Sequence, residues 1–285
     1  VRTLWSNWGR EYGILGFPTS NPSANPTTGN YTQTFNGGTI TVTGGLTFNE
    51  ASPYATFIVS AVAGAEINLT LGNTSSGSDV DATIAGFTTS YSEDGGVTWI
   101  NYTWNGTTGN RPTVPANGSG TSVYGTVLVR VNIASEEEGS SDVYEGPETF
   151  TLTANYATNN AITSTGTDTI VDDGTGRIDR NGDGDTTDSN EGTGGPGAGY
   201  EDDRTIDVVG GLTFNEGSTY ATFTVTGAVG SVMNMELGNT NSSGDTDATI
   251  SGFSVQYNTG SGWVTYTWDG ATGNRPTVPA GGTFS

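Results

Sequence analysis

The acidic stretch 179–191 has the residue types and the spacing of a cation-binding loop. Oxygen-bearing side chains stand at positions 1, 3, 5 and 7 of this stretch, in the order Asp179, Asn181, Asp183 and Asp185. Gly184 fills position 6, where a Ca2+ loop needs a sharp turn. The pattern departs at position 12, which is Asn190, because the carboxylate of Glu191 comes one residue late. The spacing predicts a Ca2+ loop, and a flexible acidic linker is the alternative.

Further carboxylates lie close to this loop in the sequence. Asp188 lies inside it, and Asp202 and Asp203 stand at the far end of a Gly-rich stretch. No helices are expected on either side, which argues against a complete EF-hand. We expect these groups to order residues 170–204 when a cation is bound.

The charge of the chain restricts its partners and its chemistry. The sequence has 30 Asp and Glu against 8 Arg, a net charge of −22, and no Lys, His or Cys. Nucleic acid is therefore excluded as an expected partner, because phosphate binding needs a basic surface. Disulfides and thiolate sites are impossible without Cys, and the commonest general base and transition-metal ligand are missing without His. Paired carboxylates remain a route to glycoside hydrolysis, but the acids lie in Gly-rich loops, so we expect no enzyme.

The elements that would position these acids occur in two copies. Gly44–Glu50 returns as Gly210–Glu216, and Tyr54–Phe57 returns as Tyr220–Phe223. Such a long repeat indicates a duplicated domain. The expected organisation is an aromatic segment at 1–38, a first domain at 39–176, an acidic linker at 177–204 and a second, incomplete domain at 205–285.

Within the first copy, apolar residues alternate with polar ones. The stripes that predict strands are Phe57 and Val59; Ile67, Leu69 and Leu71; Val127, Val129, Val131 and Ile133; and Phe150, Leu152 and Ala154. Period-two runs between Gly, Asn and Asp are typical of strands with one buried face. The sequence therefore predicts an all-β protein of antiparallel sandwiches. The turn pattern Ser92–Trp99, similar to the structural hairpin turn of sialidases, predicts a hairpin with Trp99, Tyr102 and Trp104 packed near it.

Four separated motifs of the first copy together resemble the Calx-β domain. They are Phe48–Glu50 with Ala55–Phe57, Val127–Val131, Tyr144–Leu152 and Thr169–Gly174. The chain is more similar still to the Calx-β-like repeats of long bacterial surface proteins and adhesins. This resemblance implies tandem immunoglobulin-like sandwiches that bind Ca2+ at one end, with ligands at Glu50, Glu145, Glu148, Asp172 and Asp173, and at Glu216 in the second copy. Solvated loop acids are the alternative interpretation of these positions.

The first 38 residues differ from both copies. Leu15–Thr19 reads Leu-Gly-Phe-Pro-Thr, and a spacer and Tyr31–Gly37 follow it. This order resembles the LGFP repeat of bacterial cell-surface proteins, which is associated with attachment to the cell envelope. The segment either caps the first sandwich or binds envelope or host carbohydrate.

The second copy lacks counterparts of Val127–Ile133 and Phe150–Leu152. We expect strands at Tyr220–Val225 and Met233–Leu237, with a hairpin that ends near Trp268. Their apolar face would need cover, either from further polypeptide of the same chain or from a neighbouring chain by strand complementation.

Two functions fit these features. The first is a non-enzymatic, calcium-stiffened structural repeat of an extracellular filament, stalk or surface layer. The alternative is an adhesin module whose aromatic segment recognises carbohydrate. In both cases the expected partners are neighbouring repeats or copies of the chain at the cell surface, and no apolar run reaches the length of a membrane span.

Overall fold

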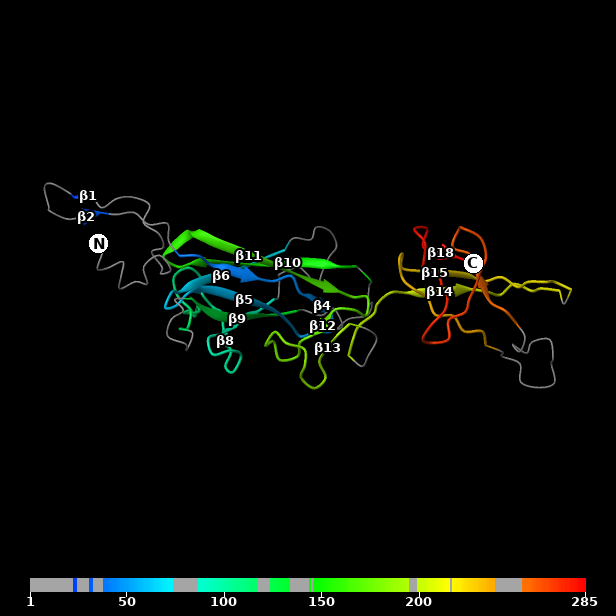
Figure 1. Ribbon diagram of the computed structural model, residues 1–285, viewed down its shortest axis with the longest axis horizontal. Helices are drawn as coiled ribbons and strands as arrows, with labels where there is room; N and C mark the ends of the chain where they lie inside the picture. The colour runs from blue at the N-terminus through cyan, green and yellow to red at the C-terminus, as the bar shows by residue number, and fades with distance from the viewer. Residues whose placement is uncertain are drawn as a thin grey trace. The chain divides into compact units, whose positions relative to one another are not determined.

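The computed structural model describes residues 23–24, 31–32, 38–73, 87–116, 124–133, 144, 146–194, 199–215, 217–238 and 253–285. Every regular element in these residues is a strand, as Figure 1 shows, so the all-β prediction is confirmed. The chain divides into two compact units, Val1–Asp203 and Arg204–Ser285. The aromatic segment contributes the short pair β1 (Ser23–Ala24) and β2 (Tyr31–Thr32). The motif Leu15–Thr19, on which the LGFP resemblance rests, lies outside the described residues.

Besides the β1–β2 pair, the described part of unit 1 contains two larger sheets. The six-stranded sheet has, in spatial order, β13 (Gly192–Thr193), β12 (Arg177–Ile178), β4 (Thr47–Asn49), β11 (Asn159–Val171), β10 (Glu148–Tyr156) and β6 (Ile67–Asn73). The five-stranded sheet has β3 (Thr41–Thr43), β5 (Tyr54–Val62), β9 (Tyr124–Asn132), β7 (Thr89–Ser92) and β8 (Ile100–Asn101). Neighbouring strands are antiparallel, except that β4 runs parallel to β11 and β12.

The core of unit 1 lies between these two sheets. On β9, Val127, Val129 and Val131 are fully buried, as the alternation predicted. The ring of Phe57 on β5 meets the ring of Phe150 on β10 edge-on, with centroids 5.7 Å apart. Side chains from both sheets therefore share one apolar core, which is consistent with a β-sandwich.

The chain crosses from one sheet to the other between β3 and β4. The N–H of Gly45 donates to the carbonyl of Thr167 at 2.7 Å, and the N–H of Leu46 donates to Oδ1 of Asp168 at 3.0 Å. A side chain at Gly44 would lie 2.8 Å from the Thr167 carbonyl oxygen, so the crossing requires glycine there. Asp168 is thus a fully buried acid that holds the crossover in place.

The turn at 92–99 is the predicted hairpin between β7 and β8. Asp94 accepts hydrogen bonds from the hydroxyl of Ser92 at 2.7 Å and from the N–H and hydroxyl of Thr98 at 2.9 and 2.6 Å. The hydrogen bonds from Thr98 are the main reason why the pKa of Asp94 is lowered to about 2. The turn is therefore built by hydrogen bonds to an ionised Asp94.

Residues of the segment expected to be a linker fold onto unit 1. Strand β12 pairs with β4, and β13 pairs with β12. The N–H of Asp203 donates to the carbonyl of Asp172 at 3.0 Å. The described part of 177–203 therefore belongs to the first unit, and unit 2 begins at Arg204.

Unit 2 has fewer strands. One sheet contains β14 (Ile206–Val209), β15 (Thr224–Gly227) and β18 (Thr283–Phe284), and the second pairs β16 (Gln256–Tyr257) with β17 (Val264–Thr265). The predicted strands at Tyr220–Val225 and Met233–Leu237 are largely wrong, because β15 begins only at Thr224 and no strand forms at 233–237. In unit 1 the equivalent strands pair with β9 and β10, and a strand without a partner leaves its backbone groups unpaired.

Candidate metal centre

Three acidic residues lie at neighbouring strand ends of the six-stranded sheet. Glu50 follows β4, Asp172 follows β11, and Glu148 begins β10. The pairing of Asn49 with Val171 and of Glu148 with Ile170 brings these strand ends side by side. Glu50, Glu148 and Asp172 are only 5%, 5% and 4% exposed. The fold thus buries three carboxyl residues at neighbouring strand ends.

A second acidic segment, residues 201–203, passes the same end of the sheet. Asp202 forms an antiparallel bridge with Asp173, and the N–H of Gly174 donates to the carbonyl of Glu201 at 2.8 Å. Together with the contact between Asp203 and Asp172, this brings the predicted residues 172–173 and 202–203 beside one another. Of the remaining predicted ligands, Glu145 and Glu216 lie outside the described residues.

Asn49 connects these two acidic segments, and the sequence did not indicate this role. Its side-chain amide donates to the carbonyls of Thr175 and Glu201 at 2.9 and 3.0 Å. Its Oδ1 accepts from the N–H of Glu201 at 3.0 Å, and the residue is fully buried. The only sequence signal is that Phe48-Asn49-Glu50 returns as Phe214-Asn215-Glu216.

The chemistry of this sheet end suits a hard cation. Carboxylates that are buried near one another lose hydration and repel one another. A bound cation relieves both effects, and carboxylate and carbonyl oxygens are the donors that Ca2+ prefers. The backbone carbonyls of Asp172 and Glu201 are already held in place by hydrogen bonds.

The predicted loop at 179–191 is anchored by Asp179. This side chain is fully buried, and its two oxygens accept hydrogen bonds from the N–H groups of Gly182 at 2.6 Å and Gly184 at 2.9 Å. The N–H of Asp179 donates to the hydroxyl of Ser52 at 3.0 Å. Burial raises the pKa of Asp179, and the hydrogen bonds from Gly184 and Gly182 oppose that shift.

The remaining acids of the loop differ in their hydrogen-bond partners. The Asn181 amide donates to Asp183 at 3.0 Å and to Asp188 at 2.8 Å, so these three side chains are together. Asp185 instead accepts from the N–H and hydroxyl of Thr187, which lowers its pKa. Glu191 accepts from the N–H of Arg180 at 2.7 Å, while its buried Oε2 has no hydrogen-bond partner among the described residues. A cation between Asp183 and Asp188 would require the Asn181 amide to rotate and present Oδ1.

A cationic side chain fixes the loop to the five-stranded sheet. The guanidinium of Arg130 on β9 lies between the rings of Tyr54 and Trp99, 4.4 and 4.2 Å from their centroids. Its Nη1 donates to the carbonyl of Asn181 at 2.6 Å. A side chain at Gly182 would lie 2.4 Å from Arg130 Cδ, so the contact is close. The sequence predicted that Trp99 packs near its hairpin, but it did not predict the contact between Trp99 and Arg130.

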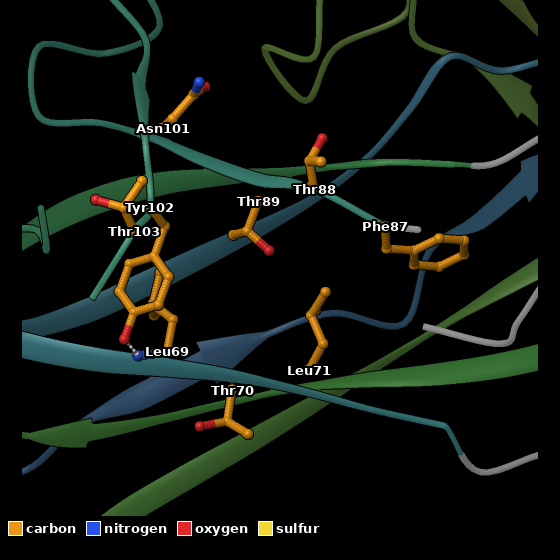
Figure 2. Close-up of a pocket in the computed structure, with 9 residues that line it drawn as sticks. All are labelled: Leu69, Thr70, Leu71, Phe87, Thr88, Thr89, Asn101, Tyr102 and Thr103. Atoms are coloured by element: carbon orange, nitrogen blue, oxygen red, sulfur yellow. Dashed lines mark hydrogen bonds between the residues drawn. The ribbon is translucent and has the colours of Figure 1, made fainter. Parts of the chain in front are cut away.

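A groove at the side of the sandwich contains none of the predicted ligands. It has a volume of about 440 Å3 and lies between β6 and the β7–β8 hairpin, as Figure 2 shows. Its lining residues are Leu69, Thr70, Leu71, Phe87, Thr88, Thr89, Asn101, Tyr102 and Thr103. The hydroxyl of Tyr102 accepts from the N–H of Leu69 at 3.0 Å and joins the two edges. The groove has no carboxylate and therefore no ligand set for a hard cation.

The fold brings these acidic residues to one end of the sheet, but their side chains do not form a complete set of metal ligands. In the described part of the chain, no three Asp or Glu side chains are arranged closely enough to hold a metal ion.

No helix among the described residues is long and apolar enough to cross a membrane. No known protein-family model matches the sequence, and no curated protein matches it. The site must therefore be interpreted from its own residues.

Proposed function

We propose that this chain is a non-enzymatic, calcium-stiffened structural repeat of an extracellular filament, stalk or surface layer. In this proposal both units are immunoglobulin-like sandwiches of the Calx-β-like type. The observation that supports it best is the burial of Glu50, Glu148 and Asp172, each at one of three neighbouring strand ends. Acids that serve only solubility would be exposed, because acidic side chains are rarely buried.

A cation at this end would join segments that are distant in the sequence. The strand ends carrying Glu50, Glu148 and Asp172 would share one ion with the acidic residues 202–203. Those residues complete unit 1 and lead directly into unit 2. Ca2+ would therefore stiffen the last segment of the first repeat, which is the property that an array of repeats requires.

The loop at 179–191 supplies a second cation site in this proposal. Asp179 shapes the loop from inside, whereas Asp183, Asp188 and Asn181 supply the exposed oxygens. Arg130 fixes the loop to β9, so ions at the loop and at the sheet end would act on the same unit. Both sites use oxygen donors only, as expected for Ca2+.

The proposal is tested by calorimetric Ca2+ titration and by melting of the intact chain. Ca2+ at about 100 times its Kd adds about 2.7 kcal/mol, which is roughly 5–10 °C in Tm for a domain of this size. The variant Asp172→Asn should lose most of this shift. The matched control Asp207→Asn removes an exposed acid of unit 2 and should retain the shift.

Two outcomes would contradict this proposal, the first in whole and the second in part. If elemental analysis finds no bound Ca2+ and the melting curves in Ca2+ and in chelator coincide, calcium stiffening is wrong. If Asp183→Asn abolishes the shift and Asp172→Asn does not, the loop rather than the sheet end is the calcium site.

A further inference from the structure

Two Asn-Gly pairs of the described residues differ in the surroundings of the glycine nitrogen. They are Asn105-Gly106 and Asn181-Gly182. An Asn-Gly pair can lose ammonia spontaneously, because glycine has no side chain to keep its backbone nitrogen away from the side-chain carbonyl carbon of the asparagine. Both asparagines are exposed, but Gly106 is exposed and Gly182 is buried. The same chemistry is therefore placed in two different environments.

The turn at 103–110 leaves the nitrogen of Gly106 accessible. Oδ1 of Asn105 accepts hydrogen bonds from the N–H groups of Thr107 at 3.0 Å and Thr108 at 2.9 Å. These donors hold the side chain in the turn and would stabilise the negative charge that develops on Oδ1 when Cγ is attacked. Among the described residues, no hydrogen bond holds the N–H of Gly106. A Cβ at Gly106 would also contact nothing within 4 Å, so the space around this nitrogen is open.

The acidic loop encloses the corresponding nitrogen of the second pair. The N–H of Gly182 donates to Oδ1 of Asp179 at 2.6 Å, and a Cβ at Gly182 would lie 2.4 Å from Arg130 Cδ. The side chain of Asn181 is held as well, because its Nδ2 donates to two aspartates of the loop at 3.0 and 2.8 Å. Attack on this side chain would have to break these hydrogen bonds and displace Arg130.

We infer that Asn105 is a site of spontaneous deamidation in the folded chain and that the loop protects Asn181 from the same reaction. The nitrogen of Gly106 forms a bond to Cγ of Asn105, the bond from Cγ to Nδ2 breaks, and the proton of the attacking nitrogen leaves with the amide as ammonia. Water then opens the cyclic imide at either carbonyl, which gives aspartate or isoaspartate at position 105. The reaction needs only water, so it is independent of the calcium proposal.

The second unit shows a turn of this kind built around aspartate. The repeat counterpart of Asn105 is Asp269. Its Oδ1 accepts hydrogen bonds from the N–H groups of Ala271 at 2.9 Å and Thr272 at 2.7 Å, the same two positions that donate to Asn105. The aspartate product should therefore keep the turn and add a negative charge. Isoaspartate lengthens the backbone instead, and it should misalign these hydrogen bonds.

The test incubates the intact chain in chelator at pH 8 and follows deamidation at each position by peptide mass spectrometry. In the folded chain, Asn105 should react about tenfold or more faster than Asn181, because the hydrogen bond from Gly182 to a carboxyl group must break before that nitrogen can attack. The matched control is the same chain unfolded in urea, where both pairs lose their surroundings and should react at similar rates. The product mimic Asn105→Asp should have the Tm of the parent chain.

Three results would overturn the inference. Equal rates at the two positions in the folded chain would show that the loop does not protect Asn181. No deamidation at Asn105 in the folded chain, over the time in which the urea-unfolded chain is converted, would show that the turn prevents the attack. A lower Tm for Asn105→Asp would show that the turn of unit 1 does not accommodate the product as the turn of unit 2 does.

Discussion

Raising the pH from 4 to 8 should destabilise unit 1 through Asp168. Burial raises the pKa of this carboxyl group from 3.8 to about 7, and the backbone N–H groups of Leu46 and Gly45 and the charge of Arg177 oppose the shift only in part. Between these two values the folded chain holds a proton that the unfolded chain has released. The free energy of unfolding therefore falls as the pH rises. Below pH 3.8 Asp168 does not lower the free energy of unfolding, and above pH 7 it lowers this free energy by its full amount, about 4 kcal/mol.

The variant Asp168→Asn keeps the size and the Oδ1 acceptor of this side chain but cannot titrate. Urea unfolding from pH 4.5 to 8 in chelator, with unit 1 assigned by hydrogen exchange on β11, gives both stability curves. Relative to the variant, the parent chain should lose up to about 1.4 kcal/mol per pH unit over this range. The control Asp94→Asn should run parallel to the parent, because the pKa of Asp94 is lowered to about 2. If the Asp168→Asn curve is also parallel, the buried acid does not titrate in this range and the reasoning is refuted.

Three further predictions concern unit 1. Gly109→Ala should lower Tm more than Gly106→Ala. Both glycines have a positive φ, but only a Cβ at position 109 would come close to the Thr103 carbonyl oxygen, at 2.2 Å. Equal decreases in Tm would contradict this expectation. Tyr156→Phe should cost about 1–3 kcal/mol in urea unfolding, because the buried hydroxyl donates to Thr39 O at 2.6 Å and accepts from Val62 N–H at 3.0 Å; an unchanged midpoint would show that these bonds contribute nothing. Arg130→Lys should expose residues 180–190 to proteolysis while Arg111→Lys does not, since Arg130 bonds to the loop and Arg111 bonds to Glu66 instead; equal cleavage of both variants would refute the anchoring role.

The strands of unit 1 could be predicted because burial alone produces their pattern. Val127, Val129 and Val131 alternate with more exposed residues since one face of β9 meets the core. The hairpin at 92–99 was predictable for a different reason, because Asp94 bonds to residues only two and four positions away. Hydrogen bonds between residues close in the sequence and alternating burial can therefore both be predicted from a single sequence.

The contacts that organise the candidate site were not predictable in this way. Asn49 bonds to Glu201 across 152 positions, Arg130 bonds to Asn181 across 51, and Asp168 bonds to Leu46 across 122. Nothing in the local sequence of any of these residues identifies its partner. The acids at the sheet end were indicated only by the family resemblance, because alternation places strands but not the ends at which their carboxylates meet.

The duplication also separates what the local sequence determines from what tertiary pairing determines. The N–H groups of Asn110 and Asn274 both donate to a threonine hydroxyl at 2.8 Å, and Gly109 and Gly273 adopt φ of 118° and 117°. The guanidinium of Arg111 stacks 4.0 Å from Trp104, and its repeat counterpart stacks 3.9 Å from Trp268. The turn at 103–111 thus forms in the same way as the turn at 267–275, whereas the strand at 54–57 has no counterpart at 220–223, where no described strand pairs as β9 does in unit 1. Strand formation on this side therefore depends on the presence of a pairing strand as well as on the local sequence.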